Sequence, residues 1–170
     1  AHADFANITF RNCTANGTAF GCHIKFKDAQ TGRVDAVRFE NIHIVDPQRY
    51  AIGINQNGQS LEQDVSSGVG SSVHIGNVSY VNITGTALIA GAFDCNPGAL
   101  ACRGITMEHV HIAAKIGCSF TNVFGSGLDV SPASCVPPAA LAPPPSSPRL
   151  PPCQASRAAV ASAARRRSSR

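Results

Sequence analysis

The sequence contains no tryptophan, two tyrosines and one methionine among 170 residues. Aromatic residues make up 6% and apolar residues 44%, so we expect one domain with an aliphatic core. No apolar run is long enough to cross a membrane, and the opening AHADFANITF lacks the basic and apolar segments of a signal peptide. We therefore expect a mature or truncated protein that has no membrane partner.

Acidic residues are absent from the last part of the chain, which explains the net charge of +4. Residues 136–170 hold six of the fourteen Lys and Arg residues, which leaves eight basic and ten acidic residues in 1–135. The body of the protein is therefore mildly acidic, and a nucleic-acid partner is not expected from the charge.

Seven cysteines and five Asn-x-Ser/Thr sequons favour a secretory history. The sequons begin at Asn7, Asn12, Asn16, Asn77 and Asn82, and each is a possible site of N-glycosylation. We therefore expect a secreted protein, located outside the cell or in a cell wall.

Helical spacing is nearly absent before residue 135, where four segments instead share an alternating pattern: ITFRNC (8–13), VRFENI (37–42), VSYVNI (78–83) and ITMEHV (105–110). In each, the alternation changes phase at Asn12, Asn41, Asn82 or His109. Asn and His tolerate the left-handed backbone region, so one such residue can turn a sharp corner between two strands. We expect these corners to stack and the Asn side chains to form a hydrogen-bonded ladder.

Recurring corners predict a solenoid of about four coils, in which a further apolar run follows each corner. A β-sandwich of alternating strands is the alternative, but its strands need no repeated corner residue. Residues 1–135 should form this all-β domain. Residues 136–170 are rich in Pro, Ala, Ser and Arg and should be a disordered basic tail that contains an unpaired Cys153. The tail either binds an anionic polymer or has no function.

The chain resembles the C-terminal portion of polygalacturonases, glycoside hydrolase family 28. Four stretches in the family's order carry the resemblance: GCHIK with the strand that follows it, AIGINQ (51–56), DCNPGALACRGITM (94–107) and CSFTNVFGSGLDVSPASC (118–135). The resemblance implies a right-handed parallel β-helix and hydrolysis of α-1,4-galacturonosyl bonds of pectin with inversion, without a cofactor.

The catalytic motifs of that family are missing from this sequence: Asn-Thr-Asp, an Asp-Asp pair and Gly-His-Gly. An inverting glycosidase needs two carboxyl groups about 6.5–9.5 Å apart. The ten acids are scattered, and the close neighbours Glu62 and Asp64 lie in a polar loop that would not raise a pKa. We therefore assign no catalytic residue.

His23 and Lys25 are two residues apart on an expected strand, so their side chains should point the same way. The resemblance places them where the family holds galacturonate carboxylates with an Arg and a Lys. His23 lacks the bidentate fork of Arg, and we expect it to become cationic in an acidic cell wall. The alternative is that both only decorate a solvated face. The family's Tyr and Cys that complete the cleft are aligned with Gly58 and Gln59 here, and Tyr50 lies too early in the coil to substitute.

Other residue groups support structure rather than chemistry. His109 and His111 have the spacing of metal ligands on a strand, but no third ligand is suitably placed, so we expect no metal. Cys22 and His23 are adjacent and should face opposite sides, which excludes a nucleophile and base pair. Two disulfides are expected to close loops, Cys95–Cys102 and Cys118–Cys135.

Two functional hypotheses follow. The first is a fragment of a polygalacturonase-like hydrolase, inactive alone, with a monomeric chain that binds polygalacturonate or pectin. The second is a non-catalytic extracellular β-helix that binds an acidic polysaccharide through Lys25 and the basic tail or has a structural role. A secreted adhesin-like coil is a third interpretation.

Overall fold

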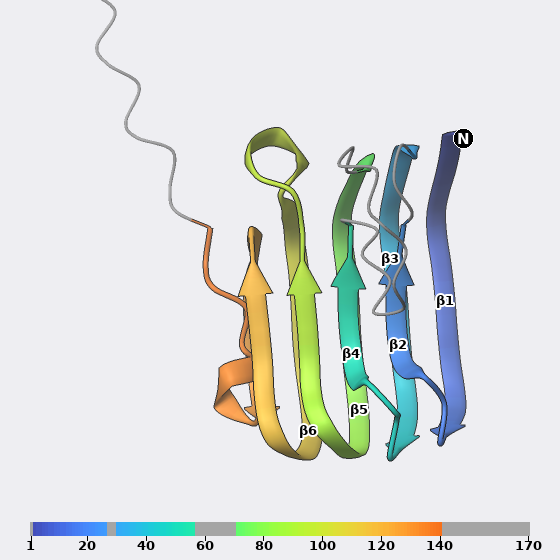
Figure 1. Cartoon of the computed structure of the whole chain (residues 1–170), viewed down its shortest axis with the longest axis vertical. Helices are drawn as coiled ribbons and strands as arrows, with labels where there is room; N and C mark the ends of the chain where they lie inside the picture. Colours follow the sequence, from blue (N-terminus) through green and yellow to red (C-terminus); the bar gives the residue numbers. More distant parts are fainter. Residues whose placement is uncertain (1, 27–29, 57–70, 141–170) are drawn as a thin grey trace, which may run out of the picture. The chain divides into compact units, whose positions relative to one another are not determined.

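The computed structural model describes residues 2–26, 30–56 and 71–140, and these residues form parallel strands and two short 3-10 turns (Figure 1). The elements are β1 (His2–Asn16), β2 (Phe20–Lys25), β3 (Thr31–Val45), β4 (Tyr50–Asn55), β5 (Ser72–Asp94), η1 (Gly98–Leu100), β6 (Cys102–Thr121), β7 (Val123–Ser131) and η2 (Ala133–Cys135). In β5 and β6 one continuous strand replaces the two strands that the first coils use.

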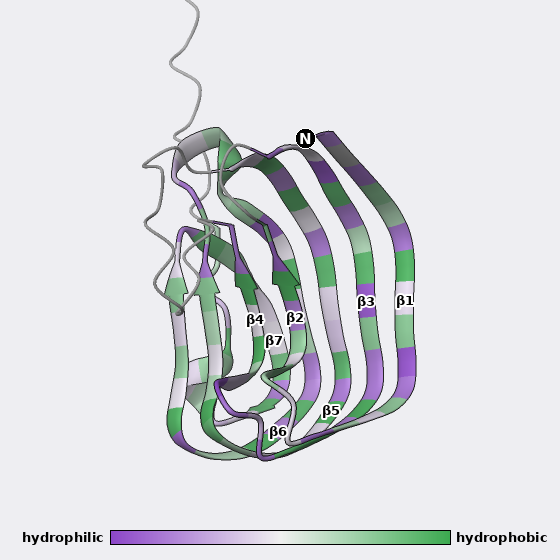
Figure 2. Ribbon diagram, turned by 45° about the vertical axis from the view of Figure 1, so that its right-hand side comes forward, coloured by the Kyte–Doolittle hydropathy of each residue, from purple (hydrophilic) through white to green (hydrophobic). Residues whose placement is uncertain are grey.

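Every strand pairing among the described residues is parallel. β1 pairs with β3, β3 with β5, β5 with β6, and β6 with β7, while β2 pairs with β4 and β4 with the second half of β5. Equivalent strands of successive coils therefore lie side by side (Figure 2). The prediction of a partial parallel β-helix is confirmed, and the antiparallel sandwich is not what forms.

The four predicted corner residues all have left-handed backbones. Their φ angles are 57° at Asn12, 54° at Asn41, 52° at Asn82 and 53° at His109. The Asn41 side chain donates a hydrogen bond to Asn12 Oδ1 at 3.0 Å, and that of Asn82 donates to Asn41 Oδ1 at 2.8 Å. The expected ladder is therefore present. It ends at His109, whose Nδ1 lies 2.7 Å from Asp129 of the next coil.

A second line of corners was not expected from the sequence. Asn7, Ala36 and Asn77 have φ angles of 57°, 53° and 52°, and Gly104 continues the line at 68°. Ala36 carries no turn signal, and a left-handed alanine is unfavourable by itself. Its conformation follows from the register, which places it between two left-handed Asn residues of neighbouring coils.

The interior confirms the alternating pattern but is not purely aliphatic. Val37, Phe39, Ile42 and Ile44 are buried on both sides of the Asn41 corner, as the phase change predicts. Phe39 also stacks on Phe10 of the preceding coil and on Tyr80 of the next, with ring centroids 5.2 and 5.3 Å apart. The expectation of an aliphatic core was therefore wrong in this respect, because a few aromatic residues stack along the solenoid axis.

Both expected disulfides are present, Cys95–Cys102 beside η1 and Cys118–Cys135 at the last coil. Among the described residues, no helix is long and apolar enough to cross a bilayer. The predicted disordered tail and Cys153, as well as Gly58, Gln59 and the loop acids Glu62 and Asp64, lie wholly or almost wholly outside the described residues.

Candidate functional site

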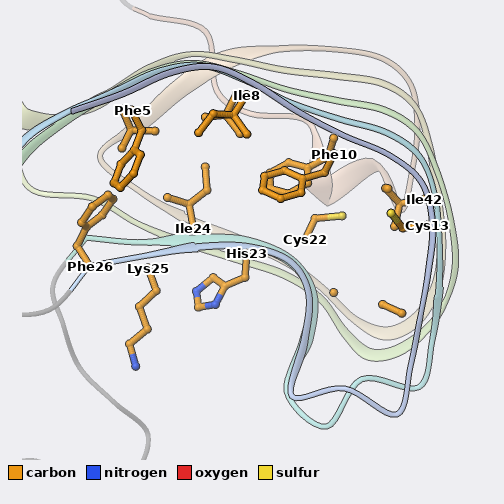
Figure 3. Close-up of a pocket in the computed structure, with 15 residues that line it drawn as sticks. Phe5, Ile8, Phe10, Cys13, Cys22, His23, Ile24, Lys25, Phe26 and Ile42 are labelled. Carbon is orange, nitrogen blue, oxygen red and sulfur yellow. The ribbon is translucent and has the colours of Figure 1, made fainter. Parts of the chain in front are cut away.

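The candidate site is the outer face of β2. Cys22, Ile24 and Phe26 point into the solenoid, whereas His23 and Lys25 point out of it in the same direction (Figure 3). This follows from the alternation of side chains along a strand. The structure thus brings the two predicted binding residues together, and it separates Cys22 from His23 as expected.

A low polar floor continues from these residues across three further strands. The register places Gly53, Ala92 and Ser119 in line with His23. It places Asn55, Asp94 and Thr121 in line with Lys25, as the next row of the same face. Small residues therefore lie beside the imidazole, where the ring of Tyr50 packs over Gly53, and polar residues lie beside the ammonium.

Tyr50 is a site residue that sequence reasoning missed. Its hydroxyl lies 2.8 Å from His23 Nε2, across the β2–β4 pairing. Phe20 completes the group, with its ring centroid 4.2 Å from that of His23 and 4.8 Å from that of Tyr50. The signal that could have found Tyr50 is the repeat itself, because the coil spacing pairs Tyr50 with Phe20, three residues before His23.

The environment of His23 keeps it neutral. Burial, and then the positive charge of Lys25, lowers the pKa of His23 from 6.5 to about 4. Burial also raises the pKa of Tyr50 to about 12, so the phenol keeps its proton. The expectation that His23 is cationic in a mildly acidic wall is therefore wrong, because the aromatic neighbours remove the water that would solvate the charge.

Lys25 is the exposed cation of this face and forms no salt bridge with any other described residue. An ammonium group with a flexible stem can meet a carboxylate without a fixed geometry. Of the two predicted binding residues, Lys25 thus carries the exposed charge, and the lowered pKa of His23 favours its uncharged form.

A cavity of about 440 Å³ lies on the opposite side of β2. It is the solenoid interior, lined by apolar side chains such as Phe5, Ile8, Phe10 and Ile24, and it is open at the coil formed by β1 and β2 (Figure 3). Its apolar walls do not suit an acidic sugar, so we place the candidate site on the outer face.

Carboxyl groups with shifted pKa values do not resemble a general acid. Hydrogen bonds from Arg38 lower the pKa of Glu40, and hydrogen bonds from His109 and His111 lower that of Asp129. A general acid needs the opposite shift. Asp35 and Asp4 are engaged with Arg33 and His2. These contacts give no reason to assign a catalytic residue within the described part of the chain.

His109 and His111 both contact the same oxygen of Asp129, at 2.7 and 3.2 Å. The three side chains are about half exposed and satisfy one another. Within residues 2–26, 30–56 and 71–140, no group of His, Cys, Asp and Glu is arranged to hold a metal ion. The cluster closes the corner ladder.

Comparison with known proteins gives one consistent family. The sequence model of Glycosyl hydrolases family 28 matches residues 1–135. The chain is 29% identical over 117 residues to the Probable endopolygalacturonase D of Neosartorya fischeri, and 30% identical over 112 residues to that of Aspergillus oryzae. Each alignment covers 66% of this chain, and 23% and 22% of the respective relatives.

The Endopolygalacturonase D of Aspergillus niger is 33% identical over 84 residues, which cover 46% of this chain and 16% of that protein. The chain thus spans about a fifth of the length of the curated relatives that it matches. No solved structure matches it significantly. The family match covers the whole solenoid and agrees with its parallel strands, and on that basis the chain belongs to glycosyl hydrolases family 28.

Proposed function

We propose that this chain is the part of a polygalacturonase-like hydrolase that holds an acidic polysaccharide, and that it lacks the catalytic carboxylates. The whole protein would hydrolyse α-1,4-galacturonosyl bonds of pectin with inversion. Three observations support the proposal: the family match, the relatives named as endopolygalacturonases, and the shared outward direction of His23 and Lys25. The last of these carries the binding role.

The binding role rests on the exposed charge of Lys25, which lies in one row with the polar residues Asn55, Asp94 and Thr121. Lys25 would meet a galacturonate carboxylate, and His23 would donate a hydrogen bond to a neighbouring oxygen. An exposed ammonium–carboxylate contact contributes about 0.2–1 kcal/mol. Affinity for a single sugar unit would therefore be low, and tight binding would need several contacts along the floor.

Secretion and N-glycosylation are also part of the proposal. Asn77 and Asn82 use their amide nitrogens in hydrogen bonds to Asp35 and Asn41, both at 2.8 Å. A glycan on either amide would crowd the neighbouring coil. We therefore expect occupancy at Asn16, which is exposed at the end of β1, rather than at Asn77 or Asn82. Mass spectrometry of the secreted protein measures this.

A hydrolysis assay should distinguish this chain from the whole protein. We expect no new reducing ends when this chain is incubated with polygalacturonic acid, and new reducing ends with the product of the complete gene. Binding should also depend on one lysine: Lys25→Met should weaken the affinity of the chain for immobilised polygalacturonate at low salt by up to about fivefold. The matched control is Lys115→Met, which removes an exposed charge from β6. Equal loss in both variants would refute the assignment of Lys25.

The alternative is a non-catalytic polysaccharide-binding β-helix. The paired state of the described acids and the absence of the catalytic motifs favour it. It predicts no hydrolysis by the complete gene product, and salt-sensitive binding that disappears when residues 136–170 are deleted. Hydrolysis by that product would exclude it.

A further inference from the structure

The contact between Tyr50 and His23 is built by three strand positions. Tyr50 pairs with Phe20 at the start of β4, and its hydroxyl reaches forward to His23 Nε2. The rings of Tyr50 and His23 meet edge to face at an interplanar angle of 86°, and Phe20 packs against both of them, with centroids 4.2 Å from His23 and 4.8 Å from Tyr50. The imidazole therefore has little freedom to turn.

Gly53 is what lets the tyrosine ring reach this position. A Cβ atom at residue 53 would lie 2.6 Å from Tyr50 Cε2 and 2.3 Å from the carbonyl oxygen of Ala92. Glycine thus permits close packing of Tyr50 and of the next coil, directly beside His23 in the β2–β4 register.

The chemistry of the pair depends on which group donates in the Tyr50–His23 contact. A phenol has one proton to donate, and the imidazole is neutral, so one ring nitrogen accepts and the other carries a proton. With the Tyr50 hydroxyl donating to Nε2, the proton of the imidazole is on Nδ1. His23 then offers one N–H donor and no charge to a ligand on the outer face.

We propose that Tyr50 is a positioning residue that holds His23 as a neutral Nδ1–H donor. The site then binds one carboxylate at Lys25 and an uncharged oxygen at His23. This inference rests on the proposed function and specifies its substrate class. The uncharged oxygen is the hydroxyl or the methyl-ester carbonyl of a galacturonate unit, so the site accepts partly methyl-esterified galacturonan.

The preference for an uncharged group at position 23 follows from the cost of removing a charge from water. A cationic side chain next to Lys25 would leave a charge unpaired whenever the facing carboxyl is esterified, and an unpaired, partly buried charge is costly. A neutral N–H donor can form a hydrogen bond with an ester carbonyl, a hydroxyl or a carboxylate, and it leaves no charge unpaired when the carboxyl is esterified. The His23 position therefore does not select for a second charge.

The first experiment needs no ligand. Nitrogen-15 NMR of the imidazole should show Nε2 unprotonated and Nδ1 protonated in the wild type at pH 7. In Tyr50→Phe the ring remains but the hydroxyl is lost, and the two tautomers should mix. Tyr80→Phe is the matched control, because it removes a buried hydroxyl that donates to the Gly53 carbonyl at 3.4 Å and leaves His23 untouched. A wild-type imidazole protonated on Nε2 would overturn the proposal.

The second experiment measures specificity by calorimetry with two galacturonate oligomers of equal length, one de-esterified and one half methyl-esterified. The wild type should bind both with affinities that differ less than about threefold. His23→Arg adds an exposed charge pair and should favour the de-esterified oligomer by about fivefold, which is the upper range for such a pair. Wild-type preference for the de-esterified oligomer by tenfold or more would refute the inference and leave the proposed function standing. Binding of neither oligomer would refute both.

Discussion

At the end formed by β1 and β2, the solenoid interior opens to solvent, and Phe5 and Phe10 are 49% and 50% exposed. At the other end, β7 and η2 close the last coil. Gly125 donates a backbone hydrogen bond to Pro138 at 2.8 Å, and Cys135 is fully buried in its disulfide. The interior is thus covered at one end and exposed at the other, although the coils between the two ends follow one pattern.

The difference shows how a solenoid distributes stability. Each coil buries its apolar face only against its neighbours, so an end coil needs a cap to complete its core. β1, β2 and β7 each pair on one side only among the described strands, and an unpaired edge favours association. The backbone of β7 is hydrogen-bonded in part to Pro138, whereas the interior beside β1 and β2 opens to solvent. We therefore expect the β1–β2 end to be the weak end of this chain, and the following predictions test that.

Truncation of stacked aromatic residues should give the largest contrast. Phe39 is 6% exposed between Phe10 and Tyr80, so Phe39→Ala should lower the free energy of unfolding by about 4 kcal/mol. Phe10→Ala, at the open end, should cost about 1 kcal/mol because half of that side chain is already in water. Urea unfolding of both variants measures this. Equal losses would mean that the open end is covered in solution.

Removal of the disulfide at the closed end should have the next largest effect on the free energy of unfolding. Cys118 and Cys135 are 17 residues apart, and a disulfide across a loop of about 15 residues contributes about 3 kcal/mol in the chain-entropy model. We expect the double variant Cys118→Ser, Cys135→Ser to lose about that amount. The shorter Cys95–Cys102 loop should matter less when it is removed in the same way. A larger loss at Cys95–Cys102 would show that the last coil contributes little.

The corner ladder gives a smaller contrast between interior and end. Asn41 donates to Asn12 and accepts from Asn82, whereas Asn12 only accepts. Glycine tolerates the left-handed backbone, so Asn→Gly removes the side-chain bonds without straining the corner. Asn41→Gly should cost about 2 kcal/mol and Asn12→Gly about 1 kcal/mol in thermal unfolding. If both variants lose the same amount, the two bonds of Asn41 do not act independently.

The sequence predicted the parts of the fold that repeat. Asn12, Asn41, Asn82 and His109 interrupt an apolar alternation that is visible in one dimension, so the corners and the parallel stacking could be predicted. Ala36 could not, because its left-handed backbone is imposed by neighbouring coils and contradicts its own preference.

The candidate site was predictable to the level of side-chain direction. The alternation of a strand gives the shared face of His23 and Lys25, as observed (Figure 3). The protonation of His23 was not predictable, because it depends on Phe20 and Tyr50, which reach it through the curvature of the coil and the register of β4. The charge of a titratable side chain depends on the residues around it. The sequence shows which residues these are only after the coils have been aligned with one another.

The smallest effect concerns His23, on the outer face of β2 at the open end, and it depends on pH. The pKa of His23 is about 4 in the folded chain and near 6.5 when unfolded, so between these values the unfolded chain binds a proton that the folded chain does not. The contribution of neutral His23 is complete above pH 6.5 and is lost as the pH falls to 4. After allowance for solvent screening, we expect the wild type to lose about 1 kcal/mol more than His23→Gln between pH 7 and pH 4. Urea unfolding at both pH values measures the difference, with His74→Gln on β5 as the exposed control. Parallel pH curves for the wild type and His23→Gln would show that solvent reaches the imidazole, and that the aromatic neighbours of β2 do not shield the face on which the proposed ligand lies.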